Sequence, residues 1–133
     1  MSEQREARVE DVMVTDLYNI NGLASVGEAI QMMKKHRVSS LVVDRRDADD
    51  EVGLVEVADV ANEVIARNRA PDRVSVYEVM TKPVVTLPPG MLVRYAVRLL
   101  ARLGHSRAVV VDDARNAVGM VTLRDLVLGP RED

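Results

Sequence analysis

Apolar and polar residues follow a pattern along this chain that occurs twice. A first stripe has the i, i+3, i+4, i+7 spacing of an amphipathic helix and consists of Val26, Ala29, Ile30 and Met33. The same stripe recurs 67 residues later (from 26 to 93), at Val93, Ala96, Val97 and Leu100. Ser25 and Glu28 flank the start of the first stripe as a capping box, which predicts a helix that begins there.

Short β-branched runs follow both helices, "SLVV" at 40–43 and "AVVV" at 108–111, and predict strands. Polar turns ("DRRDADDE" and "DDARNA") come next, and then a further pair of short runs, "VGLV" and "VGMV". A last helix is expected from about Val57 to Asn68 in the first copy, and it stops early at Gly129-Pro130 in the second. Each copy is therefore predicted as strand, helix, strand, strand, helix.

A three-stranded unit of this size buries too little apolar surface to be stable alone. We therefore expect an α/β (α+β) fold in which two βαββα repeats pack with pseudo-two-fold symmetry, with a ligand cleft between them. The predicted boundaries are an N-terminal tail (1–8), repeat 1 (9–69), a Pro-containing linker (70–77), repeat 2 (78–128) and a C-terminal tail (129–133).

The two copies differ in length by one residue. Val12 matches Val79 at an offset of 67 (79 − 12), whereas Asp59 matches Asp125 at an offset of 66 (125 − 59). Fifteen steps separate Ala29 from Asp44 and sixteen separate Ala96 from Asp112, so we expect the first copy to lack one residue in this interval. A bulge or a shortened loop should absorb the difference.

Composition narrows the function classes. The chain has 133 residues, of which 47% are hydrophobic and 29% charged, and its apolar runs are too short to cross a membrane. It has no cysteine, which excludes disulfides and thiol catalysis. A net charge of −3 and the lack of Phe and Trp disfavour nucleic-acid binding. With no signal-peptide pattern at the N-terminus, we expect a cytoplasmic protein.

Four motifs in register, each present twice, carry a family resemblance. They are "DVM" or "EVM" at the start of a copy, Ala-x-x-x-Met/Leu in the helix, a Val-rich strand that ends in Asp, and Gly-x-x-Thr-x-x-Asp. Together they resemble a tandem pair of CBS domains, also called a Bateman module, over about residues 9–128. The resemblance implies a regulatory, non-enzymatic module that binds AMP, ADP or ATP, or else S-adenosylmethionine or NADH. It also implies a homodimer that signals to an unidentified partner protein.

The resemblance assigns roles to residues. In such pairs the motif aspartate accepts hydrogen bonds from the ribose hydroxyls and the threonine faces the phosphate, which implies these roles for Asp125 and Thr122. A basic residue before the Val-rich strand contacts phosphate in family members, and Arg107 occupies that place. The adenine is held by the other repeat. The implied ligand-binding set is Thr122, Arg124, Asp125, Arg107, Met13, Tyr18, Val38 and Ser39.

The first copy departs from the motif because Glu56 stands where the threonine is expected. A carboxylate about 4 Å from a phosphate repels it by roughly 4 kcal/mol at an effective dielectric near 20. Ser40 stands at the position of Arg107 and supplies no compensating charge. We therefore expect an altered second site that binds phosphorylated nucleotides poorly, formed by Glu56, Asp59, His105 and Ser106.

A structural interpretation stands beside the functional one. The stretch "TLRD" is also a capping box for the last helix, with Thr122 at the N-cap and Asp125 three residues on. The alternative function is thus a ligand-free interaction module with capped, non-binding clefts. His36 and His105 lie in non-equivalent places, so we expect no metal site, and no nucleophile and base converge as in an enzyme. The second apolar row on the first helices (Met32, Leu92, Leu99 and Leu103) predicts burial in a dimer.

Overall fold

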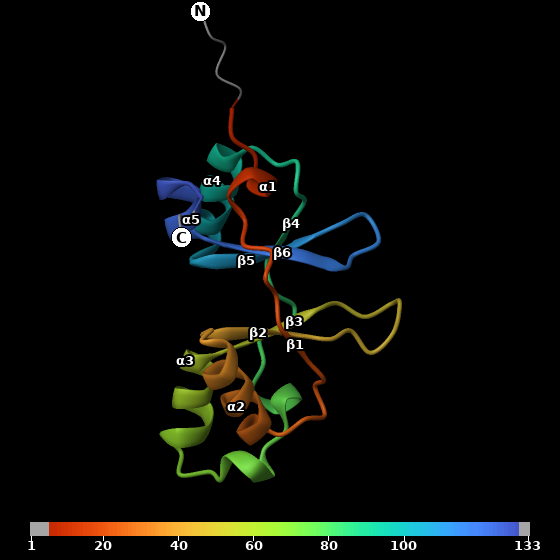
Figure 1. The fold of residues 1–133 in the computed structure, drawn as a ribbon, viewed down its shortest axis with the longest axis vertical. Helices are drawn as coiled ribbons and strands as arrows, with labels where there is room; N and C mark the ends of the chain where they lie inside the picture. Colours follow the sequence, from red (N-terminus) through yellow and green to blue (C-terminus); the bar gives the residue numbers. More distant parts are fainter. Residues whose placement is uncertain (1–5, 131–133) are drawn as a thin grey trace, which may run out of the picture. The chain divides into compact units, whose positions relative to one another are not determined.

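The fold is described from a computed structural model that covers residues 6–130, so the outer parts of both predicted tails lie outside the described residues. The chain forms two compact units (Figure 1). One comprises residues Tyr18–Val84 and is named here the Asp59 unit. The other joins the segment that ends at Leu17 to the segment that starts at Val85, and is named the Asp125 unit.

The Asp59 unit contains a three-stranded sheet in the order β1-β2-β3. Strand β1 runs parallel to β2, and β2 runs antiparallel to β3. The strands are β1 (Asn19–Ile20), β2 (Ser40–Val43) and β3 (Gly53–Glu56). The helical elements are α2 (Val26–His36), α3 (Val57–Val60), a π-helical turn (Ala61–Ile65) and two short 3-10 helices (Pro71–Arg73 and Val76–Glu78).

The Asp125 unit repeats this topology, with a parallel β4-β5 pair and an antiparallel β5-β6 pair. Its strands are β4 (Thr86–Leu87), β5 (Arg107–Val111) and β6 (Ala117–Thr122). Its helices are α1 (Val9–Val12), α4 (Val93–Leu103) and α5 (Leu123–Leu128). The predicted mixed α/β fold with two strand–helix–strand–strand–helix repeats is confirmed.

The predicted helix starts and stops follow from local hydrogen bonding. At α2 the amide of Glu28 donates to Ser25 Oγ over 3.1 Å, and the amide of Ser25 donates to Glu28 Oε2 over 3.2 Å, as the capping box predicts. Helix α2 ends at Arg37 and α4 at Gly104, both in the left-handed conformation that satisfies the last carbonyls. The predicted last helix of the first copy is present, but it passes from α to π geometry at Ala61.

Each opening segment pairs with the third strand of the other copy. Val14 exchanges two backbone hydrogen bonds with Met120 of β6, of 2.8 and 2.9 Å. Thr81 exchanges the equivalent pair with Leu54 of β3, of 2.8 and 3.0 Å. Helix α1, although first in sequence, therefore belongs to the core of the Asp125 unit.

The one-residue difference between the copies lies in the hairpin, not ahead of Asp44 as the sequence comparison predicts. Val43 pairs with Gly53, and Val110 pairs with Gly119. Val43 and Val110 are 67 residues apart, so the interval from the first helix to this strand has the same length in both copies. Between these matched pairs, nine residues lie in the first copy (44–52) and eight in the second (111–118). The second copy adds a register shift between Val110 and Val111, and this bulge re-aligns its shorter hairpin.

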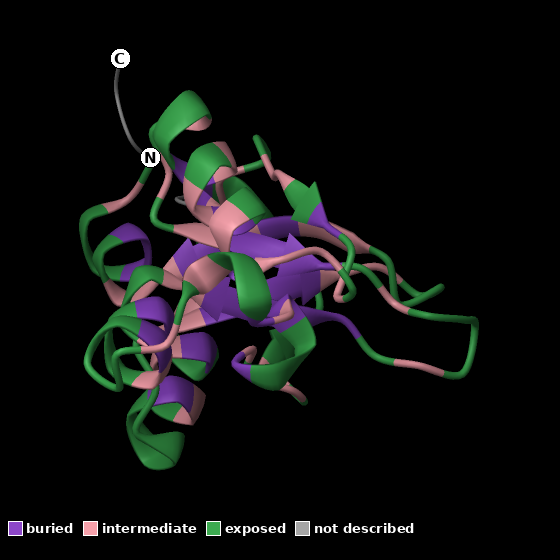
Figure 2. Cartoon of the chain, turned by 90° about the horizontal axis from the view of Figure 1, so that it is seen from below, coloured by how far each residue is buried: buried purple, intermediate pink, exposed green. Residues whose placement is uncertain are grey.

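Buried residues lie mainly on the strands and on one side of each helix (Figure 2). Leu41 anchors the core of the Asp59 unit, and Leu87 and Leu100 anchor that of the Asp125 unit. The segment predicted as a linker contributes to the first of these cores, because Val74 is 3% and Val76 0% exposed. In the part of the chain that the structure describes, no helix is both long enough and apolar enough to cross a membrane.

The second apolar row on the first helices is divided in the structure. Met32 packs against the core of the Asp59 unit and Leu99 against that of the Asp125 unit. Leu92 is partly buried, whereas Leu103 is 49% exposed. Only the last of the four residues is thus an exposed apolar side chain, and the dimer remains a prediction.

The close approach of the opening segment to β6 depends on Gly119. A Cβ atom there would lie 2.5 Å from Met13 Sδ and 3.2 Å from the carbonyl oxygen of Val14. We expect Gly119→Ala to lower the free energy of unfolding by about 1–3 kcal/mol, because the methyl group overpacks this contact. Gly90→Ala is the matched control, since a Cβ there meets nothing within 4 Å. Urea denaturation that gives equal stability for the two variants would contradict this prediction.

Candidate functional site

Thr122 and Asp125 lie where β6 passes directly into α5. Thr122 is the N-cap, and its Oγ1 accepts a hydrogen bond of 3.2 Å from the amide of Asp125. The amide of Thr122 donates in return to Asp125 Oδ2 over 3.1 Å. The predicted capping box is therefore present. Asp125 is only 1% exposed, and its Oδ1 lies 3.9 Å from Nη1 of Arg124.

A cationic side chain stands beside this cap. Arg107 is the first residue of β5 and pairs in register with Thr122 of β6, so the two residues are direct cross-strand neighbours. The Nε atom of Arg107 is buried. Residues with a guanidinium, a hydroxyl and a carboxylate thus lie at one end of the sheet, which is a set that suits a phosphate together with a sugar hydroxyl.

Other predicted residues are divided between the units. Met13 lies in the Asp125 unit, with its side chain against Gly119. His105 and Ser106 are exposed between α4 and β5, and the carbonyl of Ser106 accepts a hydrogen bond of 2.9 Å from the amide of Leu123. Five of the eight predicted ligand-binding residues therefore belong to the Asp125 unit: Met13, Arg107, Thr122, Arg124 and Asp125.

The remaining three belong to the Asp59 unit. Tyr18 precedes β1 and stacks on the imidazole of His36, with ring centroids 3.9 Å apart and an interplanar angle of 14°. Val38 lines an apolar groove on the same unit. Ser39 is exposed, and its carbonyl accepts a 3.0 Å hydrogen bond from Val57, as that of Ser106 does in the other copy. The histidine partner of Tyr18 is not a predicted site residue, and it follows Tyr18 by 18 positions with no motif that links them.

The Asp59 unit has the opposite charge at the equivalent place. Ser40 pairs in register with Glu56, as Arg107 does with Thr122. The amide of Glu56 donates to Asp59 Oδ2 over 2.8 Å. Burial raises the pKa of Asp59, and the nearby charge of Glu63 raises it further. This end of the sheet therefore carries carboxylates without the arginine, and it is poorly suited to a phosphate.

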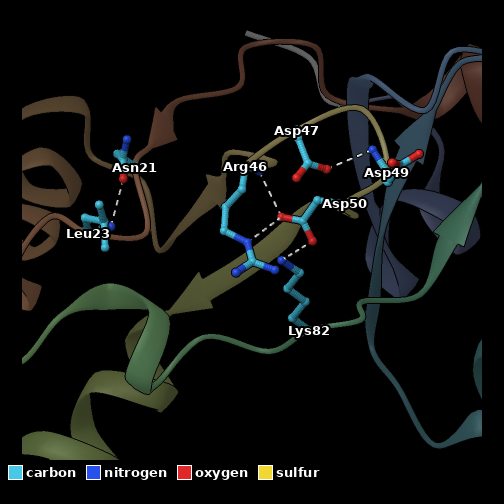
Figure 3. A network of polar contacts seen from close by, with 7 residues as sticks. All are labelled: Asn21, Leu23, Arg46, Asp47, Asp49, Asp50 and Lys82. Carbon is cyan, nitrogen blue, oxygen red and sulfur yellow. Dashed lines mark hydrogen bonds and ion pairs between the residues drawn. The ribbon is translucent and has the colours of Figure 1, made fainter.

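The hairpin between β2 and β3 contains a polar network that the sequence analysis treats as a plain turn (Figure 3). Asp50 Oδ2 accepts hydrogen bonds from the backbone and Nε of Arg46, over 2.9 and 3.3 Å. Lys82 Nζ lies 2.5 Å from Asp50 Oδ1. The Asp50 side chain is only 8% exposed, and Lys82 and then Arg46 hold its pKa well below the usual range.

This network predicts a pH-dependent contribution to stability. Because the pKa of Asp50 is lowered on folding, its carboxylate stabilises the fold above the unfolded value of about 3.9, and that stabilisation is lost as the pH falls below it. We expect Asp50→Asn to lower the melting temperature at pH 7 and to converge with the native protein toward pH 2. Asp49→Asn, at an exposed position of the same hairpin, is the control. Parallel curves of melting temperature against pH for the native protein and Asp50→Asn would contradict the assignment.

Among residues 6–130 the structure contains no group of three or more His, Asp or Glu side chains arranged to hold a metal ion. His36 is the last residue of α2, and His105 lies two residues beyond the end of α4.

A family model described as CBS domain matches the chain twice, at residues 9–66 and 76–130. Among curated proteins, the uncharacterized protein MK0525 of Methanopyrus kandleri is 28% identical over 123 residues, or 92% of this chain and 62% of its own length. The choline transport ATP-binding protein OpuBA of Bacillus subtilis is 35% identical over 120 residues, or 90% of this chain and 30% of its own length. The chain thus spans less than two thirds of these relatives.

Solved structures show the same architecture. The hexameric CBS-CP12 protein from bloom-forming cyanobacteria has a TM-score of 0.88 and 28% identity, covering 96% of this chain and 74% of its own. The CBS domain pair of protein MJ0100, in complex with 5′-methylthioadenosine and S-adenosyl-L-methionine, has a TM-score of 0.77 and 25% identity. That alignment covers 92% of this chain and 98% of the MJ0100 pair.

Proposed function

This chain belongs to the CBS-domain family, whose paired domains are regulatory ligand-binding modules, and we propose that it senses an adenosine-containing ligand at Asp125. In this proposal the ribose hydroxyls donate to the buried carboxylate. The phosphate lies near Arg107 and the hydroxyl of Thr122. Ligand binding then changes the affinity of the module for a partner protein, because the ligand binds one conformation more tightly than another.

The observation that carries this proposal is the position of Asp125. A carboxylate that is 1% exposed is costly to bury unless it is hydrogen-bonded, and Asp125 Oδ2 accepts from the amide of Thr122 at the start of α5. Arg107 pairs in register with Thr122, which is the capping partner of Asp125. The same end of the sheet therefore offers both an acceptor for a sugar and a cation for a phosphate.

Relatives support the ligand class. The CBS pair of MJ0100 binds two adenosyl compounds, as the description of its complex states. Relatives that are named as enzymes are much longer, since this chain corresponds to 24% of the inosine-5′-monophosphate dehydrogenase of Methanocaldococcus jannaschii. We therefore propose a regulatory rather than catalytic role for this chain.

A second candidate function is a ligand-free interaction module, and the completed capping box favours it. Thr122 and Asp125 already satisfy each other through two hydrogen bonds, each from a backbone amide to the other residue's side-chain oxygen, so local structure alone accounts for both residues. The two candidate functions predict different effects of an added adenosyl compound: the sensing function predicts a higher melting temperature, and the interaction-only function predicts no change.

We propose that the working form is a homodimer. The Asp59 unit presents a groove of about 390 Å³ between α2 and α3, in which Val57 is 51% and Ile65 55% exposed. Leu103, Val127 and Leu128 are exposed on the helices of the Asp125 unit. Burial of such apolar side chains in a second copy would contribute about 25 cal/mol per Å². Light scattering of the purified chain tests this proposal.

Thermal denaturation with separate additions of AMP, ADP, ATP, S-adenosylmethionine and NADH tests the sensing function. A ligand at about 100 times its dissociation constant should stabilise the folded state by roughly 2.7 kcal/mol. We expect at least one adenosyl compound to raise the melting temperature. If none does so at millimolar concentration, the interaction-only function is the better account.

A further inference from the structure

We propose that the Asp59 unit contains an additional site for a small organic anion with an aromatic or apolar group, located at the hairpin end of its sheet. A cavity of about 790 Å³ lies there, within the size range of pockets that hold small molecules. None of the residues implied by the family resemblance lines it. The proposed site therefore shares no lining residue with the nucleotide site proposed at Asp125.

The cavity has an apolar part. Val43 and Met80 belong to its lining, and Val43 is 1% exposed. Tyr77 and Leu23 also line it, although they are 53% and 79% exposed. Two exposed side chains, an aromatic ring and a leucine, thus line the cavity together with less exposed apolar residues, and a planar or apolar ligand group could cover them.

The cavity also has a cationic side, formed by Arg45, Arg46 and Lys82. Asp50 orders two of these cations, because it binds Arg46 over 3.3 Å and Lys82 over 2.5 Å (Figure 3). Asp44 adds a carboxylate to the lining, and Asn19 holds it with a 2.9 Å hydrogen bond to Oδ1. The residues that line the cavity thus include three cations and one carboxylate, so an anion is the favoured ligand.

Comparison with the other repeat indicates that this combination of residues is specific to the Asp59 unit. At the offset of 67, Glu10 stands in place of Tyr77 and Thr15 in place of Lys82. Asp112 likewise stands in place of Arg45. At these three positions the Asp125 unit therefore has neither an aromatic ring nor a cation, although Arg115 lies elsewhere in its hairpin, and the pairing of the two features is not a by-product of the repeated fold.

The test uses phenyl phosphate as the probe, with inorganic phosphate and phenol as its two halves. In two-dimensional amide NMR spectra of the full chain, we expect phenyl phosphate to shift the amides of Gly22, Leu23, Arg46 and Tyr77. It should bind more tightly than either half. Arg45→Gln should weaken binding about tenfold through loss of a charge-assisted hydrogen bond. Tyr77→Ala should weaken it several-fold, since it removes the exposed ring.

The controls separate this site from the proposed nucleotide site. Arg102→Gln removes an exposed cation of α4 and should leave phenyl phosphate binding unchanged. Asp125→Asn should do the same while it affects AMP binding. Amide shifts confined to other parts of the chain, or equal affinity for Arg45→Gln and the native protein, would overturn the proposal. Binding of polyglutamate here without phenyl phosphate binding would overturn it in favour of an acidic protein partner.

Discussion

The Asp125→Asn variant is expected to bind AMP at least tenfold more weakly than the native protein. Ribose hydroxyls that donate to a carboxylate form charge-assisted bonds of roughly 1.5–3 kcal/mol each, and an amide oxygen replaces them with weaker neutral bonds. Asparagine keeps the size of the side chain and an oxygen that can accept from the amide of Thr122, so the cap of α5 is retained. Titration calorimetry with AMP measures the loss of affinity.

Asp59→Asn is the matched control in the other repeat. Asp59 occupies the same position of its motif and also accepts from the amide three residues before it, over 2.8 Å. Its neighbour Glu56 disfavours a phosphate there, so AMP affinity should not change in this variant. A melting temperature for Asp125→Asn within a few degrees of the native value would show that the fold is intact. Equal AMP affinity of Asp125→Asn and the native protein would refute a ribose role for Asp125.

The elements of this fold follow closely from local sequence. The stripe that starts at Val26 and the Ser25–Glu28 capping box define α2, because helix periodicity and capping act within a few residues. The same reasoning defines α5, which is capped by Thr122 at its start and by Gly129 at its end. β-branched runs likewise locate β2 and β5.

The exchange of opening segments between the copies is not visible in such patterns. Met13 packs against Gly119, and Met80 would touch a Cβ on Gly53 at 2.9 Å, so both copies carry the same complementary pair. Since a methionine in either opening segment fits the glycine of either third strand, composition does not determine which pairing forms. The choice depends on chain connectivity and on packing across the whole unit.

The ion pair in the β2–β3 hairpin cannot be inferred from local sequence. "DRRDADDE" has the composition of a solvated turn, and most of it is exposed. Asp50 is the exception, because its partner Lys82 lies 32 residues further along the chain (82 − 50). A long-range ion pair has no local spacing by which sequence analysis can find it. The placement of the one-residue difference ahead of Asp44 was wrong for a related reason, since strand register and not motif spacing fixes it.

The sequence offset and the sheet register, by contrast, agree on which residues correspond in the two copies. The sequence offset makes Ser40 the counterpart of Arg107, and the sheet register shows that these residues face Glu56 and Thr122 respectively. One cross-strand pair thus provides a cation with a hydroxyl, and the other a hydroxyl with an anion. Because the register is identical, side-chain chemistry and not backbone geometry distinguishes the two places.

Because the two registers are identical, two substitutions should be enough to convert the cross-strand pair of one unit into that of the other. The double variant Ser40→Arg/Glu56→Thr transfers the cross-strand pair of the Asp125 unit to the Asp59 unit. It removes a repulsion of roughly 4 kcal/mol toward a phosphate about 4 Å away, at an effective dielectric near 20, and adds a cation. We expect the number of AMP molecules bound per chain to rise from one in the native protein to two in the double variant.

Each single variant separates the two contributions. Glu56→Thr alone removes the repulsion and restores a hydroxyl N-cap for α3, so it should bind a second AMP weakly. Ser40→Arg alone should pair the new guanidinium with Glu56 across the strands and gain little. Titration calorimetry gives the stoichiometry in all four proteins. One AMP per chain in the double variant, with its fold intact, would show that the difference between the copies lies outside this cross-strand pair. The capped carboxylate, common to both copies, would then not be sufficient for a nucleotide site even with its cation and hydroxyl in place.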